Sequence, residues 1–138
     1  MIGGDGAISQ VKAALGTALA TISGLRTYDR QPDQINPPFA FPTLDSVEYH
    51  GAMGPGLVTQ TYTITTVVGR ASERTSERLL DTYMSYGSGG VRYAIESDVT
   101  LGGVAQTSVV EQAGPIRTIE GNDNTIYLTT EFRVIVYA

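Results

Sequence analysis

Residues 125–137 read TIYLTTEFRVIVY, and this stretch decides the fold. Successive side chains of a strand point to opposite faces, so the sequence divides into two sets. One set is Ile126, Leu128, Thr130, Phe132, Val134 and Val136, and the other is Tyr127, Thr129, Glu131 and Arg133. Burying the five large apolar side chains of the first set at about 1.5–3 kcal/mol each gives roughly 10 kcal/mol. This long strand therefore needs a cover on one face.

Length, composition and charge limit the classes of function. The 138 residues fit one domain, 1–138, in which the Gly-rich residues 1–6 are expected to be a flexible arm. The absence of Cys excludes disulfides and thiolate metal sites. The net charge of −5, with the basic residues scattered, disfavours tight and direct DNA binding. With no membrane-length apolar run and no signal-peptide pattern, we expect a soluble protein that is not exported.

Helical periodicity identifies the segments that could form helices and pack on one face of the sheet. Apolar residues of 7–23 step by three and four, which predicts one apolar stripe. A second helix, in 71–87, places Leu79, Leu80 and Tyr83 on its inner side. The expected helices are 7–23, 71–87 and 91–97, with caps at Asp5, Gly24 and Ser72.

Extended segments supply the rest of the sheet. In 57–68, four threonines form one face and apolar residues the other, so this strand is expected beside the final one with both apolar faces together. Pro42 lacks an N–H donor, which predicts a sheet edge or a bulge there. The expected strands are 25–28, 39–49, 57–68, 104–112 and 116–119, the last two separated by a turn at Gly114-Pro115. The order predicts an α+β fold with two layers, in which helices pack on one face of a largely antiparallel sheet.

Titratable residues give no catalytic pattern. The clustered candidates are Asp29, Asp33, Asp45, Glu48 and His50. They have no metal-ligand spacing, no nucleophile elbow and no phosphate-binding loop beside them. We therefore expect no enzyme, no catalytic residue, no metal and no cofactor, and interpret His50 as a solvated residue of the Gly-rich segment 49–56.

Several stretches, taken in order, carry a family resemblance. They are LRTYDRQPDQINPPFAFP at 25–42, the threonine-rich strand leading into VVGRASERTSERLLDTYM at 67–84, VRYAIESDVTLGG at 91–103 and EFRVIVYA at 131–138. Together they cover nearly the whole chain, although none is diagnostic by itself. In this order the chain resembles the tail terminator proteins of long-tailed, non-contractile bacteriophages (siphoviruses), especially those that infect actinobacteria.

The resemblance implies a structural protein of the virion at the junction of tail and neck, present in the host cytoplasm during assembly. Such a protein forms a ring, usually a hexamer, that caps the tail tube, stops its polymerisation and joins it to the head. The implied partners are other copies of the chain, the major tail tube protein and a head–tail connector or neck protein. DNA would pass through the channel without specific binding, and six copies carrying −5 each would give a ring of −30 with a mainly negative channel.

Two groups of residues are the candidate sites. Thr129, Glu131 and Arg133 are expected to face the channel. Loops at 49–56 and 112–124 are expected to contact the tube or the neck, with Met53, Leu57 and Ile116 as apolar anchors.

Three alternatives remain. A head–tail connector or head-closure ring protein of the neck would have a similar fold. A monomeric ligand-binding module would use Phe39, Phe41 and Tyr62 as a pocket, although the core explains these aromatics more simply. On the residues alone, a monomer with one wet sheet face is the preferred explanation of the threonines.

Overall fold

The computed structural model describes residues 8–22, 24–28, 37–49, 58–85, 87, 89–98, 100–103, 105, 107–121 and 124–137. Three helices and five strands occur in this part of the chain. They are α1 (Ile8–Leu19), β1 (Arg26–Thr27), β2 (Phe39–Tyr49), β3 (Val58–Arg70), α2 (Arg74–Met84), α3 (Val91–Glu96), β4 (Thr107–Glu120) and β5 (Ile126–Tyr137).

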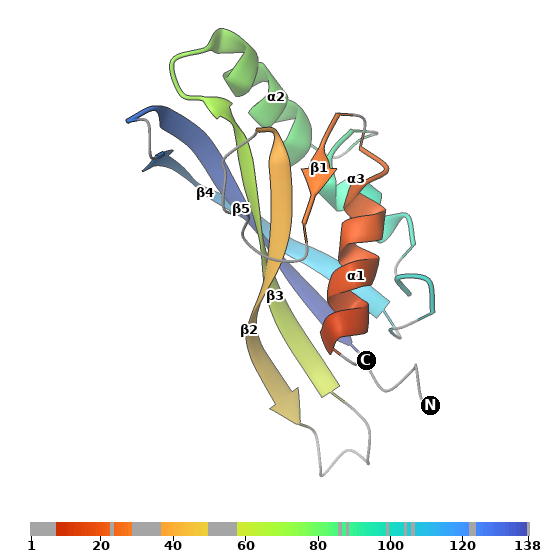
Figure 1. The fold of residues 1–138 in the computed structure, drawn as a ribbon. Helices are drawn as coiled ribbons and strands as arrows, with labels where there is room; N and C mark the ends of the chain where they lie inside the picture. The colour runs from red at the N-terminus through yellow and green to blue at the C-terminus, as the bar shows by residue number, and fades with distance from the viewer. Residues whose placement is uncertain are drawn as a thin grey trace.

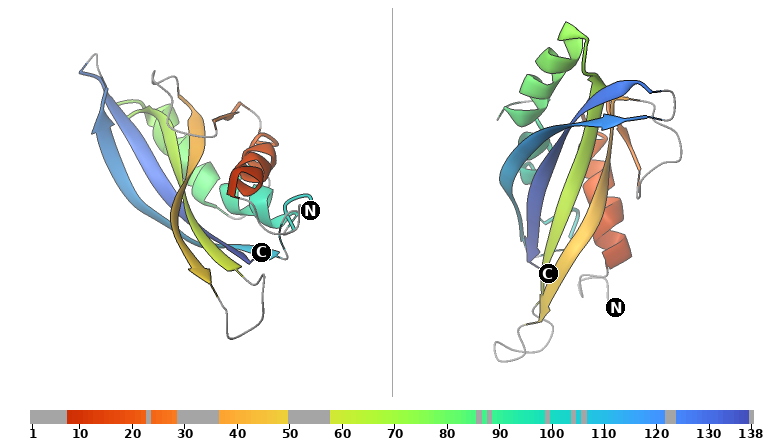
Figure 2. Two further views of the ribbon diagram at one scale, coloured as in Figure 1. Left: turned by 60° about the horizontal axis from the view of Figure 1, so that its bottom comes forward. Right: turned by 90° about the vertical axis from the view of Figure 1, so that its left-hand side faces the viewer.

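The five strands form one sheet in the order β1-β2-β3-β5-β4. All pairs are antiparallel except the pair that β2 makes with the two-residue strand β1. The sheet is strongly twisted, and α1, α2 and α3 lie on one side of it (Figures 1 and 2). The predicted α+β fold is confirmed, and the opposite side of the sheet is called the open face below.

The main core lies between the sheet and the helices. On β5, Phe132, Val134 and Val136 are at most 1% exposed, which confirms the predicted inner face over this part of the strand, whereas the predicted burial of Ile126 is wrong, since it is 44% exposed at the strand end. Ile64 of β3 pairs with Phe132, and Tyr62 with Val134, so the apolar faces of the two strands are on the same side as expected. The helices contribute Val11, Leu15, Leu19, Leu80, Tyr83, Val91 and Ile95 to this core.

Helix α1 is shorter than the sequence predicted. It ends at Leu19, and the chain continues in a tighter turn, in which the Ile22 N–H donates to the Leu19 carbonyl at 3.0 Å. Gly24 has φ +82°, a conformation that glycine adopts without steric cost, but the prediction that it caps the helix is wrong, because the helix ends five residues earlier at Leu19. Asp5 lies outside the described residues.

Helix α2 begins at Arg74, and the prediction of Ser72 as its N-cap is wrong. Its N-cap is Glu73, which makes no side-chain capping hydrogen bond. The reason is that β3 continues two residues beyond the predicted end at Val68, and the Ala71 N–H then donates to the Ile126 carbonyl at 2.9 Å. Ser72 therefore belongs to the turn between β3 and α2.

Strand β4 is continuous, so the predicted turn at Gly114-Pro115 is wrong. The register with β5 shifts between Ala113 and Ile116, and this bulge accommodates Gly114, whose φ is +116°. Pro115 is tolerated because β4 is an edge strand, where a missing donor interrupts no second ladder. Residues 112–120 are thus strand and not the contact loop expected from the sequence.

Candidate functional site

The open face carries the three residues predicted to face a channel. Thr129, Glu131 and Arg133 lie on the side of β5 opposite Phe132, as their alternation requires. Arg133 is exposed and Glu131 is half-buried, but Thr129 is only 4% exposed. Thr129 pairs with the buried Val67, so its side chain is covered within the chain and presents almost no surface to a channel.

A small second core covers part of the open face. Phe39, Phe41, Val67 and Tyr127 form this satellite cluster, and Tyr28 packs against it. The rings of Tyr28 and Phe39 meet edge to face at 5.7 Å between centroids, and those of Phe39 and Phe41 stack at 6.2 Å. The open face is therefore not a uniformly wet surface, and the satellite cluster accounts for the burial of Thr129.

Next to the satellite cluster is a polar patch, formed by Asp45, Thr63, Glu131 and Arg133 around a hollow of about 230 Å³. The Thr63 hydroxyl donates to the Asp45 carboxylate across β2 and β3. Arg133 Nε lies 3.7 Å from Glu111 Oε1, with both side chains about half exposed. A surface ion pair of this kind contributes about 0–1 kcal/mol, so it adds little to the stability of the fold. Both charged groups remain accessible to solvent or to a partner.

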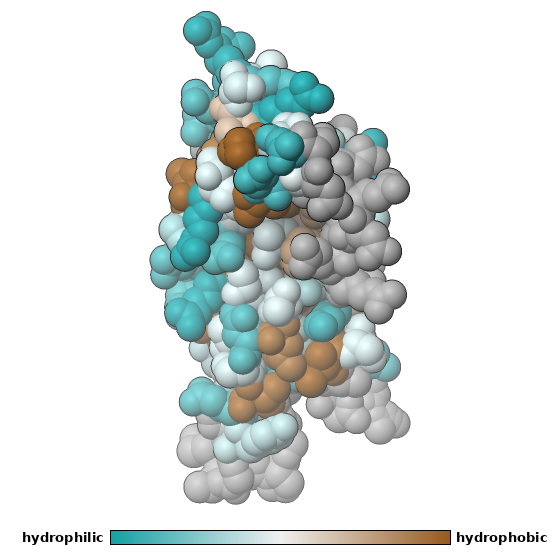
Figure 3. Space-filling view, turned by 60° about the vertical axis from the view of Figure 1, so that its left-hand side comes forward, coloured by the Kyte–Doolittle hydropathy of each residue, from teal (hydrophilic) through white to brown (hydrophobic). Residues whose placement is uncertain are grey.

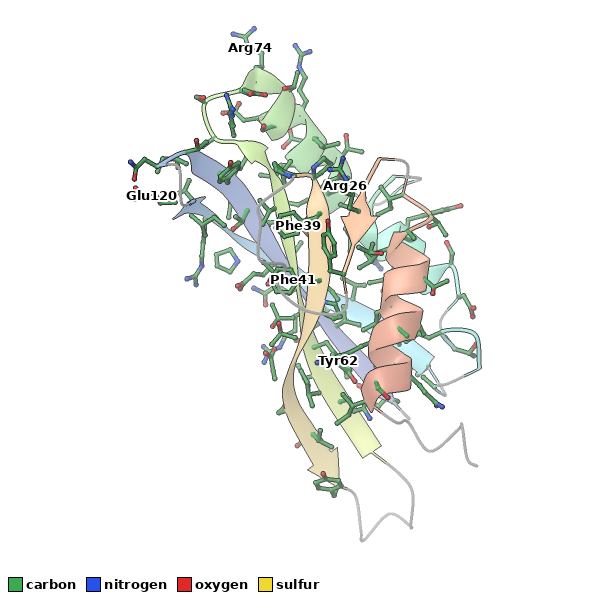
Figure 4. The ribbon with its side chains drawn as sticks, viewed as in Figure 1. Arg26, Phe39, Phe41, Tyr62, Arg74 and Glu120 are labelled. Atoms are coloured by element: carbon green, nitrogen blue, oxygen red, sulfur yellow. The ribbon has the colours of Figure 1, made fainter. Side chains whose placement is uncertain are left out.

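Charges of opposite sign separate along the open face. Residues directly opposite one another in paired strands share a face, which places three arginines at the end near α2. They are Arg26 opposite Phe39, Arg70 opposite Tyr127 and Arg117 opposite Thr129. Figure 4 shows Arg26 close to Phe39. Further from α2 the described face carries Asp45, Glu48, Glu111, Glu131 and Arg133. Acidic residues therefore predominate on the described open face only in the part away from α2, and the α2 end is basic.

At the end far from α2, the part of the open face formed by β5 and β4 carries an apolar patch. Val109 and Tyr137 are 42% and 41% exposed, and Ile135, which pairs with Val109, lies between them. This distal patch coincides with hydrophobic groups at the lower end of the surface in Figure 3. This patch was not predicted from the sequence, although three consecutive apolar residues at 134–136 break the alternation and indicate that one of them faces outward. The predicted anchors Met53 and Leu57 lie outside the described residues.

Among the described residues, both edges of the sheet are largely open. In this part of the chain β4 pairs only with β5, and its Ile116 and Ile119 are 54% and 39% exposed. Ile116, predicted as a loop contact, is thus an exposed residue of an edge strand. At the other edge, β1 pairs with β2 only at Phe39 and Ala40. Pro42 lies beyond these pairs, which confirms its predicted place at an edge.

A mostly apolar groove of about 540 Å³ lies between α1 and α3 and is lined by Ala14, Ala18, Ala94 and Leu101, among others. It is unrelated to the pocket expected for a ligand-binding module. Phe39 and Phe41 are in the satellite cluster, whereas Tyr62 is fully buried in the main core on the other side of the sheet. These three aromatics therefore do not form a common pocket.

The titratable groups with shifted pKa values are dispersed. Burial raises the pKa of Tyr62 to about 12, and its hydroxyl donates to Gln60 Oε1 at 2.6 Å. Burial also raises the pKa of Tyr83. At the surface, hydrogen bonds from the Thr100 hydroxyl and the Gly102 N–H lower the pKa of Asp98.

No general acid–base arrangement emerges from the described residues. Within the described ranges, no three His, Cys, Asp or Glu residues are grouped so that they could hold a metal ion. Asp29, Asp33 and His50 lie outside those ranges, and Asp45 and Glu48 belong to the charged part of the open face.

Comparisons with known proteins found no relative: no protein-family model matches this sequence, and the search of curated proteins gave no match. Among the described helices, none has the length and apolar character needed to cross a membrane.

Proposed function

We propose that this chain is a structural protein of a siphovirus, a tail terminator that forms a ring on the end of the tail tube, stops tube growth and joins the tube to the neck. The observation that carries the proposal is the sheet that the described residues form, with the described helices on one side of it and a long edge left unpaired by them at each end of its strand order. The order of the family-like stretches in the sequence supports the same conclusion. In this proposal the protein is not an enzyme and acts through its surfaces alone.

The two open edges suit a closed ring. β2 is antiparallel to β3, β3 to β5 and β5 to β4, so β4 runs antiparallel to β2. Copies related by rotation about a ring axis keep the same strand direction along that axis. The β4 edge of one copy would then meet residues 41–49 of β2 in the next copy in antiparallel orientation, the more stable pairing. Such a head-to-tail contact closes into a ring when the rotation between neighbouring copies is a whole fraction of a full turn. The family resemblance suggests six copies.

The open face would line the channel in this arrangement. Glu131 and Arg133 are exposed enough to contribute to the lining, and the acidic residues around them would repel DNA phosphates. The arginines near α2 would give one mouth of the channel the opposite sign. DNA would thus pass without being held along most of the channel.

The distal patch supplies the apolar surface that a rim contact needs. Tube polymerisation adds identical rings, so growth stops only when a different ring covers the growing end. Val109 and Tyr137 are exposed and Ile135 is half-buried at one end of the sheet, and they would pack on a tube or neck protein there. A head–tail connector or head-closure protein would use the same ring architecture, and the choice between these roles depends on which protein the rim binds.

The test is assembly in the phage and in vitro. Purified protein at high concentration, or mixed with tail tubes, is expected to give closed rings of about six copies in native mass spectrometry and electron micrographs. A phage that lacks the gene is expected to make DNA-filled heads and separate, abnormally long tails. Heads joined to tails of normal length in the deletion strain would refute the terminator role. Normal tails that fail to join heads would instead support a connector.

A further inference from the structure

Two arginines at the α2 end of the open face are joined by a row of paired residues that crosses the whole sheet. From edge to edge the row consists of Arg117, Thr129, Val67, Phe39 and Arg26, one residue from each strand. Paired residues share a face of the sheet, so both outer positions of the row present an arginine on the open face. Strands lie about 4.8 Å apart, which puts the two arginines about 19 Å from each other across the sheet.

A third arginine, Arg70 of β3, stands in the next row toward the end of the sheet. It pairs with Tyr127, which is two residues from Thr129 on β5, so this row lies about 7 Å further along the strands. Arg70 and Arg117 are exposed, and neither forms an ion pair with any described residue. Glu73 lines a hollow of about 660 Å³ together with Arg70, without an ion pair between them. Two positive charges are therefore available to a partner at this end of the face.

These three residues, Arg26, Arg70 and Arg117, are called the arginine belt. The satellite cluster supplies residues that lie between them in the sheet, so packing fixes the backbone that carries the belt. Arg26 is further oriented by a hydrogen bond that its Nη1 donates to the Pro37 carbonyl at 3.4 Å. A guanidinium presents a planar set of N–H donors that matches the oxygens of a phosphate group. The belt is thus a preformed surface for anionic groups.

Negative charge limits the belt on its other side. Along β5 the first acidic residue of the open face is Glu131, two residues from Thr129 toward the middle of the sheet. Asp45, Glu48 and Glu111 lie still further from α2. An anionic partner attracted by the belt would therefore be held at the α2 end and repelled by the rest of the described face.

We infer that the arginine belt binds the phosphate backbone of duplex DNA, in a contact at the α2 mouth of the channel that does not depend on base sequence. Rotation about the ring axis keeps each arginine at one height, so the belts of all copies form a single band about 7 Å high. Duplex DNA carries one charge per about 1.7 Å of its axis, so about four phosphates lie within this band. DNA is the occupant because its uniform phosphate charge can meet the same arginines of every copy. The inference rests on the proposed ring and names a ligand of its channel.

Substitution of the two exposed arginines tests the contact. Rings of the unchanged protein, titrated with a fluorescein-labelled duplex and followed by anisotropy, should lose affinity with salt at a logarithmic slope of about 3–4, as four phosphate contacts require. The double variant Arg70→Gln/Arg117→Gln should bind about tenfold or more weakly, with less than half of this slope. Arg70→Lys/Arg117→Lys keeps the charge and should stay within about threefold of the unchanged protein.

A matched control separates the belt from the overall charge. Arg74→Gln/Arg78→Gln removes the same two charges from exposed positions of α2 and should change the DNA affinity by less than about threefold. Electron micrographs verify that each variant forms rings, and circular dichroism verifies folding.

The outcomes distinguish the belt from the ring. Rings that bind no duplex at low salt, or bind it equally well with both glutamines in place, would overturn the inference and leave the proposed function intact. A glutamine variant that keeps its DNA affinity but no longer attaches to tubes or neck proteins would also overturn it, because the belt would then bind an acidic protein surface. An unchanged protein that forms no rings under any condition would refute the proposed function, and the belt with it.

Discussion

Replacing Phe132 by Ala tests the division of β5 into two faces. Phe132 is 1% exposed and pairs with Ile64 on β3 and Ala113 on β4, so its ring lies in the middle of the main core. Truncating a buried Phe to Ala costs about 3–5 kcal/mol, from lost burial and from the cavity left behind. We expect the upper part of this range, because the neighbouring Ile64 and Val134 are β-branched and cannot easily rotate into the space.

The loss is large compared with the total stability of such a domain, about 5–15 kcal/mol. For a urea m-value of about 2 kcal/mol/M, the unfolding midpoint should fall by about 2 M. Urea titration followed by circular dichroism and by fluorescence of the eight tyrosines measures it, since the chain has no Trp.

The adjacent residue provides the matched control. Glu131 points to the open face, where a substitution usually changes stability by within about 0.5 kcal/mol. Glu131→Lys should therefore unfold at nearly the original urea concentration, yet lower infectivity if the acidic part of the open face lines the DNA channel. A silent Phe132→Ala together with an unfolded Glu131→Lys would mean that the two faces have been assigned the wrong way round.

Three further changes probe features that the sequence did not reveal or that depend on local geometry. Phe39→Ala should cost about 3 kcal/mol or more in urea unfolding, because Phe39 is 2% exposed in the satellite cluster, and a change below 0.5 kcal/mol would show that this cluster is not packed. Gly90→Ala should destabilise by about 1–3 kcal/mol, since its Cβ would lie 2.1 Å from the Ser85 carbonyl oxygen, whereas Gly87→Ala meets no atom within 4 Å and should be nearly neutral. Because the folded-state pKa of Tyr62 is raised to about 12 from the ordinary value of 10, the stability it contributes is fully present below pH 10 and is lost as the pH rises towards 12. Thermal melts across this range should fall less steeply for Tyr62→Phe, and equal slopes in both proteins would contradict the assignment.

Strict periodicity made most of the fold predictable. The alternation around Phe132 and the threonines of β3 identified the inner faces, their pairing and the helix side of the sheet. The wrong predictions lie where one strand has one residue more than the strand it pairs with, so that its side chains change face. A bulge at Gly114 keeps β4 continuous where a Gly-Pro pair suggests a turn, and the extension of β3 to Arg70 moved the start of α2. Sequence spacing gives no warning of a bulge, because the partner strand decides whether the extra residue is absorbed or ends the ladder.

The candidate site was less predictable for a related reason. Thr129 has the polar side chain and the alternation of an exposed residue, yet it is buried beside the satellite cluster, opposite Val67 and two residues from Tyr127. The register between β2, β3 and β5 determines this burial, and no local pattern in β5 encodes it. The same holds for the arginines near α2, which come from three different strands and gather only in the folded sheet.

The two faces of β5 separate the demands of folding from those of assembly. Phe132, Val134 and Val136 fix the strand in the core, so their partners on β3 tolerate little change in volume. Glu131, Arg133 and Ile135 alternate with them and contribute little burial to the isolated chain. Selection can therefore alter the polar patch and the distal patch to suit a different tube or neck protein without loss of the fold. On this reasoning, variants that assemble wrongly but fold normally should be found at positions 131, 133, 135 and 137 of β5. Those that fail to fold should be found at the even-numbered positions 128–136 and at the buried Tyr127 and Thr129.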